Sequence, residues 1–136
     1  MKILIVEDDE DSGEALMHLL ADLGYEVRLV LKPSLAGAVA TELRPGVAIL
    51  DIGLPGMSGY ELVQILRALP ELNGCKYVAV TAHAGVDMVK RSIEAGFDHH
   101  LTKPLRVPDL LQCIDGSAEP HRAHPDRKGP TGFDNP

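Results

Sequence analysis

The chain has 136 residues, a formal net charge of −7 and two cysteines. This length suits one domain with a buried core, and the excess of acids argues against direct binding to nucleic acid. The apolar runs are far shorter than the roughly 20 residues that a membrane-spanning helix needs, so no membrane insertion is expected. Cys75 and Cys113 are too few for a disulfide framework and suit buried thiols in a reducing, cytoplasmic setting.

Short apolar runs alternate with amphipathic segments along residues 1–115. In chain order they predict a strand over 2–6, a helix from Asp11 or Ser12 to Gly24, a strand over 25–31, a helix over 34–43, a strand over 47–52, a helix over 58–69, a strand over 77–81, a helix over 86–95, a strand over 97–102 and a helix over 107–114. Strands that alternate with helices predict an α/β fold, with one parallel sheet covered by helices on both faces. Residues 116–136 are almost without apolar side chains, and we expect a disordered tail or linker remnant there.

Polar side chains stand where the predicted strands end. Asp8 and Asp9 follow the first strand, Asp51 ends the third, Thr81 ends the fourth and Lys103 follows the fifth. Each signal is weak alone, because an acid after a strand is more often a helix cap or a turn residue. In a parallel sheet, however, all the carboxyl ends of the strands meet at one edge, where open α/β sheets bind their ligands. We therefore expect these five side chains to form one site.

Their chemistry is complementary. Clustered carboxylates need a cation, and a set of oxygen ligands without His or Cys suits Mg²⁺, or Mn²⁺ in its place. An aspartate can act as a nucleophile toward phosphorus, and a metal ion together with a lysine ammonium offsets the charge repulsion in that reaction. The hypothesis is that Asp51 accepts a phosphoryl group.

Four motifs carry a resemblance to a known family. They are Val-Glu-Asp-Asp at 6–9, Leu-Asp-Ile-Gly-Leu-Pro-Gly-Met-Ser-Gly at 50–59, Val-Thr-Ala at 80–82 and Leu-Thr-Lys-Pro at 101–104. Over residues 2–115 the chain resembles a response-regulator receiver domain, the chemotaxis-regulator-like phosphoacceptor of two-component signalling. The loop after Asp51 and the stretch Gly-Phe-Asp-His-His-Leu-Thr-Lys-Pro-Leu at 96–105 look most like receivers of hybrid histidine kinases. The resemblance implies a flavodoxin-like (βα)5 fold with the strand order 2-1-3-4-5.

The resemblance also implies roles for the acidic residues. Asp51 matches the phosphorylated aspartate and a ligand of the metal. Asp9 matches the direct metal ligand, and Asp8 matches the acid that binds the metal mostly through water. Gly53 stands where the family supplies a backbone carbonyl to the metal and a contact to the phosphate.

Further roles follow for the switch residues. Thr81 matches the switch hydroxyl and Ala82 the small residue whose N–H faces the phosphoryl group. Lys103 matches the lysine that pairs with the phosphate, and the bond before Pro104 is usually cis in the family. His100 departs from the family pattern, because it stands where a switch Tyr or Phe is usual; a solvated histidine is an equally good interpretation.

A signalling mechanism follows from these roles. The donor is expected to be a phosphohistidine on a histidine kinase or a histidine phosphotransfer domain that docks near the first helix. Phosphorylation is expected to change the surface formed by residues 86–95, 97–102 and 107–114, and so the affinity for a downstream protein or a dimer partner that the sequence does not specify. The protein would be a phosphoacceptor rather than an enzyme.

Alternatives remain at this point. A haloacid-dehalogenase-like phosphatase also uses an aspartate nucleophile, but that family has a second acid where Gly53 stands. A flavodoxin-type flavin binder needs a phosphate loop after the first strand, where this chain has acids. A receiver-like scaffold that works without phosphorylation is disfavoured, because the key residues are all present.

Overall fold

The computed structural model describes residues 1–82 and 85–116. The elements in chain order are β1 (Lys2–Val6), α1 (Glu10–Asp22), β2 (Glu26–Val30), the 3-10 helix η1 (Pro33–Leu35), α2 (Ala36–Leu43), β3 (Val47–Asp51), α3 (Gly59–Arg67), the 3-10 helix η2 (Pro70–Leu72), β4 (Lys76–Thr81), α4 (Val86–Ala95), β5 (His99–Thr102) and α5 (Val107–Asp115). The strands form one five-stranded parallel sheet in the order β2-β1-β3-β4-β5. The predicted fold class and strand order are confirmed.

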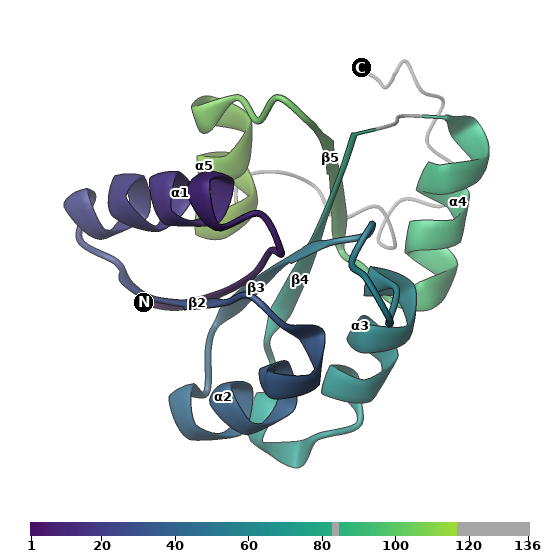
Figure 1. Ribbon diagram of the computed structural model, residues 1–136, viewed down its shortest axis with the longest axis horizontal. Coiled ribbons are helices and arrows are strands. Elements are labelled where there is room, and N and C mark those ends of the chain that lie inside the picture. The colour runs from purple at the N-terminus through teal and green to yellow at the C-terminus, as the bar shows by residue number, and fades with distance from the viewer. Residues whose placement is uncertain (83–84, 117–136) are drawn as a thin grey trace.

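Helices cover both faces of the sheet (Figure 1). α1 and α5 lie on one face, and α2, α3 and α4 lie on the other. Successive strand residues point to opposite faces, so Leu4 and Leu50 pack toward α2 and α3, whereas Ile5 and Ile49 pack toward α1 and α5. These four side chains are at most 2 % exposed. Burial on both sides explains why β1 and β3 are continuous apolar runs rather than alternating ones.

Local signals fix the ends of two helices that hold the site and its surroundings. Ser58 and Glu61 form a capping box at the start of α3: the Glu61 N–H donates to Ser58 Oγ, and the Ser58 N–H donates to the Glu61 carboxylate. Gly96 ends α4 with a φ of 117°, a left-handed conformation that glycine adopts without strain. Ser58 and Gly96 stand where the sequence predicts a helix boundary.

Several boundaries differ from the predicted ones. β5 begins at His99 instead of Phe97, because the Asp98 side chain bonds to the neighbouring β4 backbone at the Tyr77 N–H. α1 begins at Glu10 with Asp9 as its N-cap, so two acids fall in the first turn, where the helix dipole favours them. The second predicted helix is split into η1 and α2.

Two findings complete the fold. In the part of the chain that the structure describes, no helix is both long enough and apolar enough to cross a membrane. The tail predicted over 116–136 lies outside the described residues except for Gly116.

Candidate functional site

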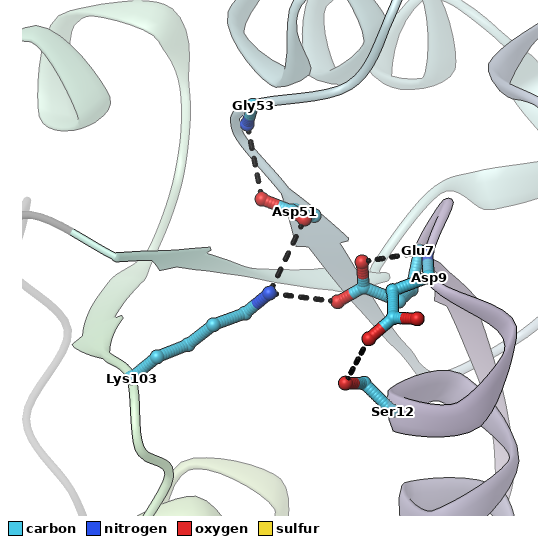
Figure 2. Close-up of polar contacts among 6 residues, drawn as sticks. All are labelled: Glu7, Asp9, Ser12, Asp51, Gly53 and Lys103. Atoms are coloured by element: carbon cyan, nitrogen blue, oxygen red, sulfur yellow. Dashed lines mark hydrogen bonds and ion pairs between the residues drawn. The ribbon is translucent and has the colours of Figure 1, made fainter.

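The carboxyl ends of the strands bring one lysine and several acids together. Asp51 is the last residue of β3, and Glu7 directly follows β1. Lys103 follows β5 and reaches back across the sheet edge (Figure 2). Its ammonium donates to a Glu7 oxygen at 2.9 Å and to an Asp51 oxygen at 3.3 Å. One cation thus joins the ends of three separate strands.

Asp51 is held from two sides. Its Oδ1 accepts a hydrogen bond of 3.0 Å from the Gly53 N–H, and its Oδ2 faces Lys103. Its side chain is 12 % exposed, so it is largely withdrawn from water while it still borders the surface. A Cβ added at Gly53 would lie 3.8 Å from Asp51 Oδ1, which is ordinary contact. The residue two positions after Asp51 therefore approaches its carboxylate with backbone alone.

Glu7 is the site residue that the sequence analysis did not assign. It prolongs β1 by one step, since its N–H donates to the carbonyl oxygen of Val30 on β2 at 3.1 Å. The residue is 7 % exposed, and its carboxylate accepts from Lys103 and from the Asp9 N–H. Burial raises the pKa of Glu7; the hydrogen bond from Lys103 works against this rise, and the charge of Asp51 adds to it. The position directly after an apolar strand was the available signal.

The charge of Lys103 is secured by the same contacts. Burial by itself lowers the pKa of a lysine, but the hydrogen bond to Glu7 and the charge of Asp51 outweigh burial, so the pKa of Lys103 lies above its usual value. The ammonium is therefore fully charged at neutral pH. It places a positive charge beside the Asp51 carboxylate.

The structure places the two predicted metal acids differently. Asp8 is exposed and belongs to the acidic group, in which ligand oxygens of Glu7, Asp8 and Asp51 lie within 4.8 Å of one another. Asp9 is not in that group: it is the N-cap of α1, and its carboxylate accepts from the Ser12 hydroxyl. Both residues follow β1, and their contacts distinguish them: Asp8 joins Glu7 and Asp51, whereas Asp9 bonds to Ser12.

The donor set fits a hard divalent cation. All three side chains of the acidic group offer carboxylate oxygens, the ligands that Mg²⁺ and Mn²⁺ prefer. Three carboxylates against one lysine leave an excess of negative charge at the strand ends. A bound cation would relieve that excess.

The predicted switch residues lie in β4, directly after it, and in β5. Thr81 ends β4, is 4 % exposed and pairs in register with Thr102. Its carbonyl oxygen accepts from the Lys103 N–H at 2.7 Å, so the backbones of the two predicted site residues are joined. Ala82 is exposed directly after Thr81. His100 is half-buried in β5 opposite Ala79, and its Nε2 is inaccessible to water.

A cleft opens beside the acids. It has a volume of about 590 Å³ and includes Glu7, Asp51 and Lys103 at its polar end. Its remaining lining is mostly apolar and comes from α1, the sheet and the segment that leads into α5, with Leu16 and Leu105 among its walls. The acidic end of the sheet is thus continuous with an apolar groove.

The fold and the site define a class: a flavodoxin-like α/β domain with an acidic cluster and a lysine at the carboxyl edge of its sheet. Comparison with known proteins makes the class specific. Residues 3–115 match the family model described as the response regulator receiver domain. The chain therefore belongs to the family of response regulator receiver domains, the modules of two-component phosphorelay signalling.

Individual relatives agree with this assignment. The chain is 34% identical over 113 residues to the phosphate regulon transcriptional regulatory protein PhoB of Rhizobium meliloti, across 83% of this chain and 50% of that protein. An uncharacterized 14.6 kDa protein of Leptolyngbya boryana is 30% identical over 114 residues, across 84% of this chain and 87% of that one. The chain thus spans about half the length of PhoB.

Solved structures share the fold. The chemotaxis response regulator CheY4 of Vibrio cholerae superimposes with a TM-score of 0.78 at 26% identity, over 86% of this chain and 98% of that one. This likeness supports the strand order and the helix arrangement described above.

Proposed function

We propose that Asp51 accepts a phosphoryl group from a phosphohistidine and that Lys103, Glu7 and Asp8 make this transfer possible. The observation that carries the proposal is the position of the Lys103 ammonium, which bridges Asp51 and Glu7 at 3.3 and 2.9 Å. A cation held there stabilises charge on an incoming phosphoryl oxygen. In the transfer, the P–N bond of the donor breaks as a P–O bond to Asp51 forms, and the donor imidazole leaves with the bonding electron pair.

The metal proposal uses the grouping of the acids. Glu7, Asp8 and Asp51 would hold Mg²⁺ or Mn²⁺, with the Gly53 carbonyl as a further ligand, and the cation would neutralise phosphoryl oxygens. In this proposal Glu7 and Asp8 take the roles that the resemblance gave to Asp8 and Asp9. Asp9 then serves to begin α1.

The donor is proposed to be a histidine kinase or a histidine phosphotransfer domain. The apolar groove between α1 and the segment before α5 reaches the acceptor, so a donor helix that seats a side chain there would bring its imidazole to Asp51. No direct contact with nucleic acid is proposed for this acidic chain, although PhoB is named as a transcriptional regulatory protein.

The output is proposed to be a change in the face formed by α4, β5 and α5. An aspartyl phosphate adds negative charge and acceptor oxygens at the end of β3. Thr81 and the Ala82 N–H would turn toward it, and His100 would repack in β5. A downstream protein or a second receiver would then read the altered face.

Mass spectrometry after incubation with acetyl phosphate and Mg²⁺ tests the proposal. We expect the wild type to gain the mass of one phosphoryl group, and Asp51→Asn to gain none. Equal mass gain in both proteins, or none in the wild type, overturns the assignment of Asp51 as the acceptor. Absence of the gain when EDTA replaces Mg²⁺ separates a metal-dependent reaction from an independent one.

A further inference from the structure

Arg67 ties three elements together at the end of the sheet away from the acidic site. It is the last residue of α3, and its Nε donates to the Gly96 carbonyl oxygen at 2.6 Å. Its Nη2 donates to Asp98 Oδ2 at 3.0 Å. Its guanidinium carbon lies 4.6 Å from the centre of the Tyr77 ring, within range of a cation–π contact. We call these four residues the Arg67 clamp.

The ion pair within the clamp, between Arg67 and Asp98, is largely shielded from water. Asp98 Oδ2 also accepts the Tyr77 N–H at 2.9 Å, and the Asp98 N–H donates to the Tyr77 carbonyl oxygen at 2.8 Å. The Asp98 side chain is only 10 % exposed and that of Arg67 is 29 % exposed. Removal of Arg67 would therefore take a charged partner from a largely buried carboxylate next to β4 and β5.

Gly96 makes the clamp possible. Its φ of 117° ends α4, and a Cβ at this position would lie 2.9 Å from Arg67 Nε. The last turn of α4 is secured as well, because the N–H groups of Gly96 and Phe97 both donate to the Ser92 carbonyl oxygen. The segment at the C-terminal end of α4 is thus fastened to α3 through Arg67 and to β4 through Tyr77.

The N-terminal half of α4 has weaker attachments. Gly85 precedes the helix and has no side chain with which to cap it, and Val86 is 85% exposed. Among the described residues, the Tyr60 hydroxyl reaches the Met88 carbonyl oxygen only at 3.5 Å, and the next contact, the Arg91 guanidinium over the Tyr60 ring at 4.5 Å, already belongs to the second half of the helix. Attachment of α4 therefore increases from its first turn to its last.

We propose that Arg67 is a positioning residue that fixes the junction between α4 and β5 during the response. With the junction held, phosphorylation at Asp51 moves the first half of α4 and the far end of β5, which are nearest to Thr81 and Lys103. This inference rests on the proposed function. In this inference, α3 determines which part of the face formed by α4, β5 and α5 moves, although α3 is not part of that face.

Amide hydrogen exchange with BeF3−, a mimic of the aspartyl phosphate, tests the clamp. Wild type, Arg67→Gln and the control Arg28→Gln are compared with Mg²⁺ alone and with Mg²⁺ plus BeF3−. Arg28 is the control because its pair with Glu42 is exposed and long, at 3.5 Å. Each variant is compared with itself, so its exchange with Mg²⁺ alone is the baseline for its response to BeF3−.

In the wild type and in Arg28→Gln we expect BeF3− to change exchange at 86–91 and to leave 92–98 unchanged. In Arg67→Gln we expect the change to spread into 92–98, with exchange rates there altered about tenfold by BeF3−, as a shift of roughly 1.4 kcal/mol in local stability produces. Arg67→Lys keeps the charge and should restore part of the confinement.

Three outcomes overturn the inference. If BeF3− changes exchange in Arg67→Gln only at 86–91, as in the wild type, Arg67 does not fix the junction. A wild-type response already spread over 86–98 shows that the junction is not fixed. A wild type that responds no more than Asp51→Asn refutes the proposed function itself, and the clamp with it. If Arg67→Gln does not fold, Asp98→Asn takes its place, since it keeps an acceptor for the Tyr77 N–H and removes the paired charge.

Discussion

The ammonium of Lys103 donates to the carboxylate of Glu7 at 2.9 Å, although the two residues are 96 positions apart in the chain. The contact closes the sheet edge around Asp51 and sets the charge balance of the site. The proposed metal ion would compete with Lys103 for the same carboxylates, and this competition determines the sign of the first prediction.

Lys103→Met should bind Mg²⁺ more tightly and accept phosphoryl groups more slowly. Loss of one positive charge near the carboxylates should lower the Kd for Mg²⁺ by about tenfold. The rate of labelling by acetyl phosphate should fall by at least about tenfold, because charge stabilisation is lost in the transition state. Calorimetric titration with Mg²⁺ and timed mass spectrometry measure the two effects. Lys32→Met, an exposed lysine outside the site, is the matched control, and equal behaviour of both variants contradicts the prediction.

Glu7→Gln and Asp9→Asn distinguish the two assignments of the metal acids. Because the Glu7 carboxylate lies in the acidic group and the Asp9 carboxylate does not, Glu7→Gln should weaken Mg²⁺ binding by roughly tenfold. Asp9→Asn should stay within about threefold of the wild type, since asparagine is also a good N-cap. Titration of both variants decides the matter: a larger loss in Asp9→Asn restores Asp9 as the direct ligand.

Gly59→Ala should destabilise the protein and disturb the acceptor. A Cβ at Gly59 would lie 2.7 Å from the Asp51 carbonyl oxygen and 2.8 Å from the Ile52 Cα, both backbone atoms that cannot swing aside. We expect a loss of about 1–3 kcal/mol in the free energy of unfolding, together with slower labelling of Asp51.

Gly37→Ala is the matched control for that variant. Gly37 lies in α2, and a Cβ there would have no neighbour within 4 Å. We expect the same substitution to leave stability unchanged or to raise it by about 0.5 kcal/mol. Urea unfolding measures both, and a comparable loss in the two variants would show that close approach to β3 is not the cause.

Stability should decline at alkaline pH. Burial raises the pKa of the Cys75 thiol to about 11 and that of Cys113 to about 12. The folded state thus keeps protons that the unfolded chain releases near pH 8.5, so the stabilisation is full below that pH and is lost as pH rises through the folded values. Burial raises the pKa of Tyr77 as well, and adds to the same trend.

Urea unfolding between pH 7 and 11 measures this decline, and Cys113→Ala should show a shallower slope above about pH 9. In a parallel assay at pH 8, both thiols of the folded protein should react far more slowly with Ellman's reagent than those of the urea-unfolded chain. Rapid native labelling of either thiol contradicts the burial that underlies the prediction.

The order of elements was predictable because short apolar runs mark the strands and apolar side chains at helical spacing mark the helices. The capping pair Ser58 and Glu61 and the terminal Gly96 act locally, so the sequence shows them directly. The start of β5 was predicted two residues early, since the apolar Phe97 resembles a strand residue while the Asp98 contact with Tyr77 is long-range.

The sequence indicates which residue types form the site. It does not indicate which of the acids after β1 turns toward Asp51. Ile3 to Val6 are all buried, at most 1 % exposed, so β1 has no alternation that would show which of the following acids turns inward. Glu7 is identified only by its contacts with Lys103, which follows β5, and with Val30 of β2. Arg67 was missed for the same reason, because its partners lie 29 and 31 residues further along the chain.

The assembly of the site from distant segments has a consequence during synthesis. Glu7 and Asp51 leave the ribosome well before Lys103, and until then neither carboxylate has the cation that bridges them. A nascent or truncated chain that ends before β5 therefore presents Asp51 without the Lys103 counter-charge. If Asp51 accepts a phosphoryl group as proposed, we expect only a chain whose last strand has joined the sheet to do so.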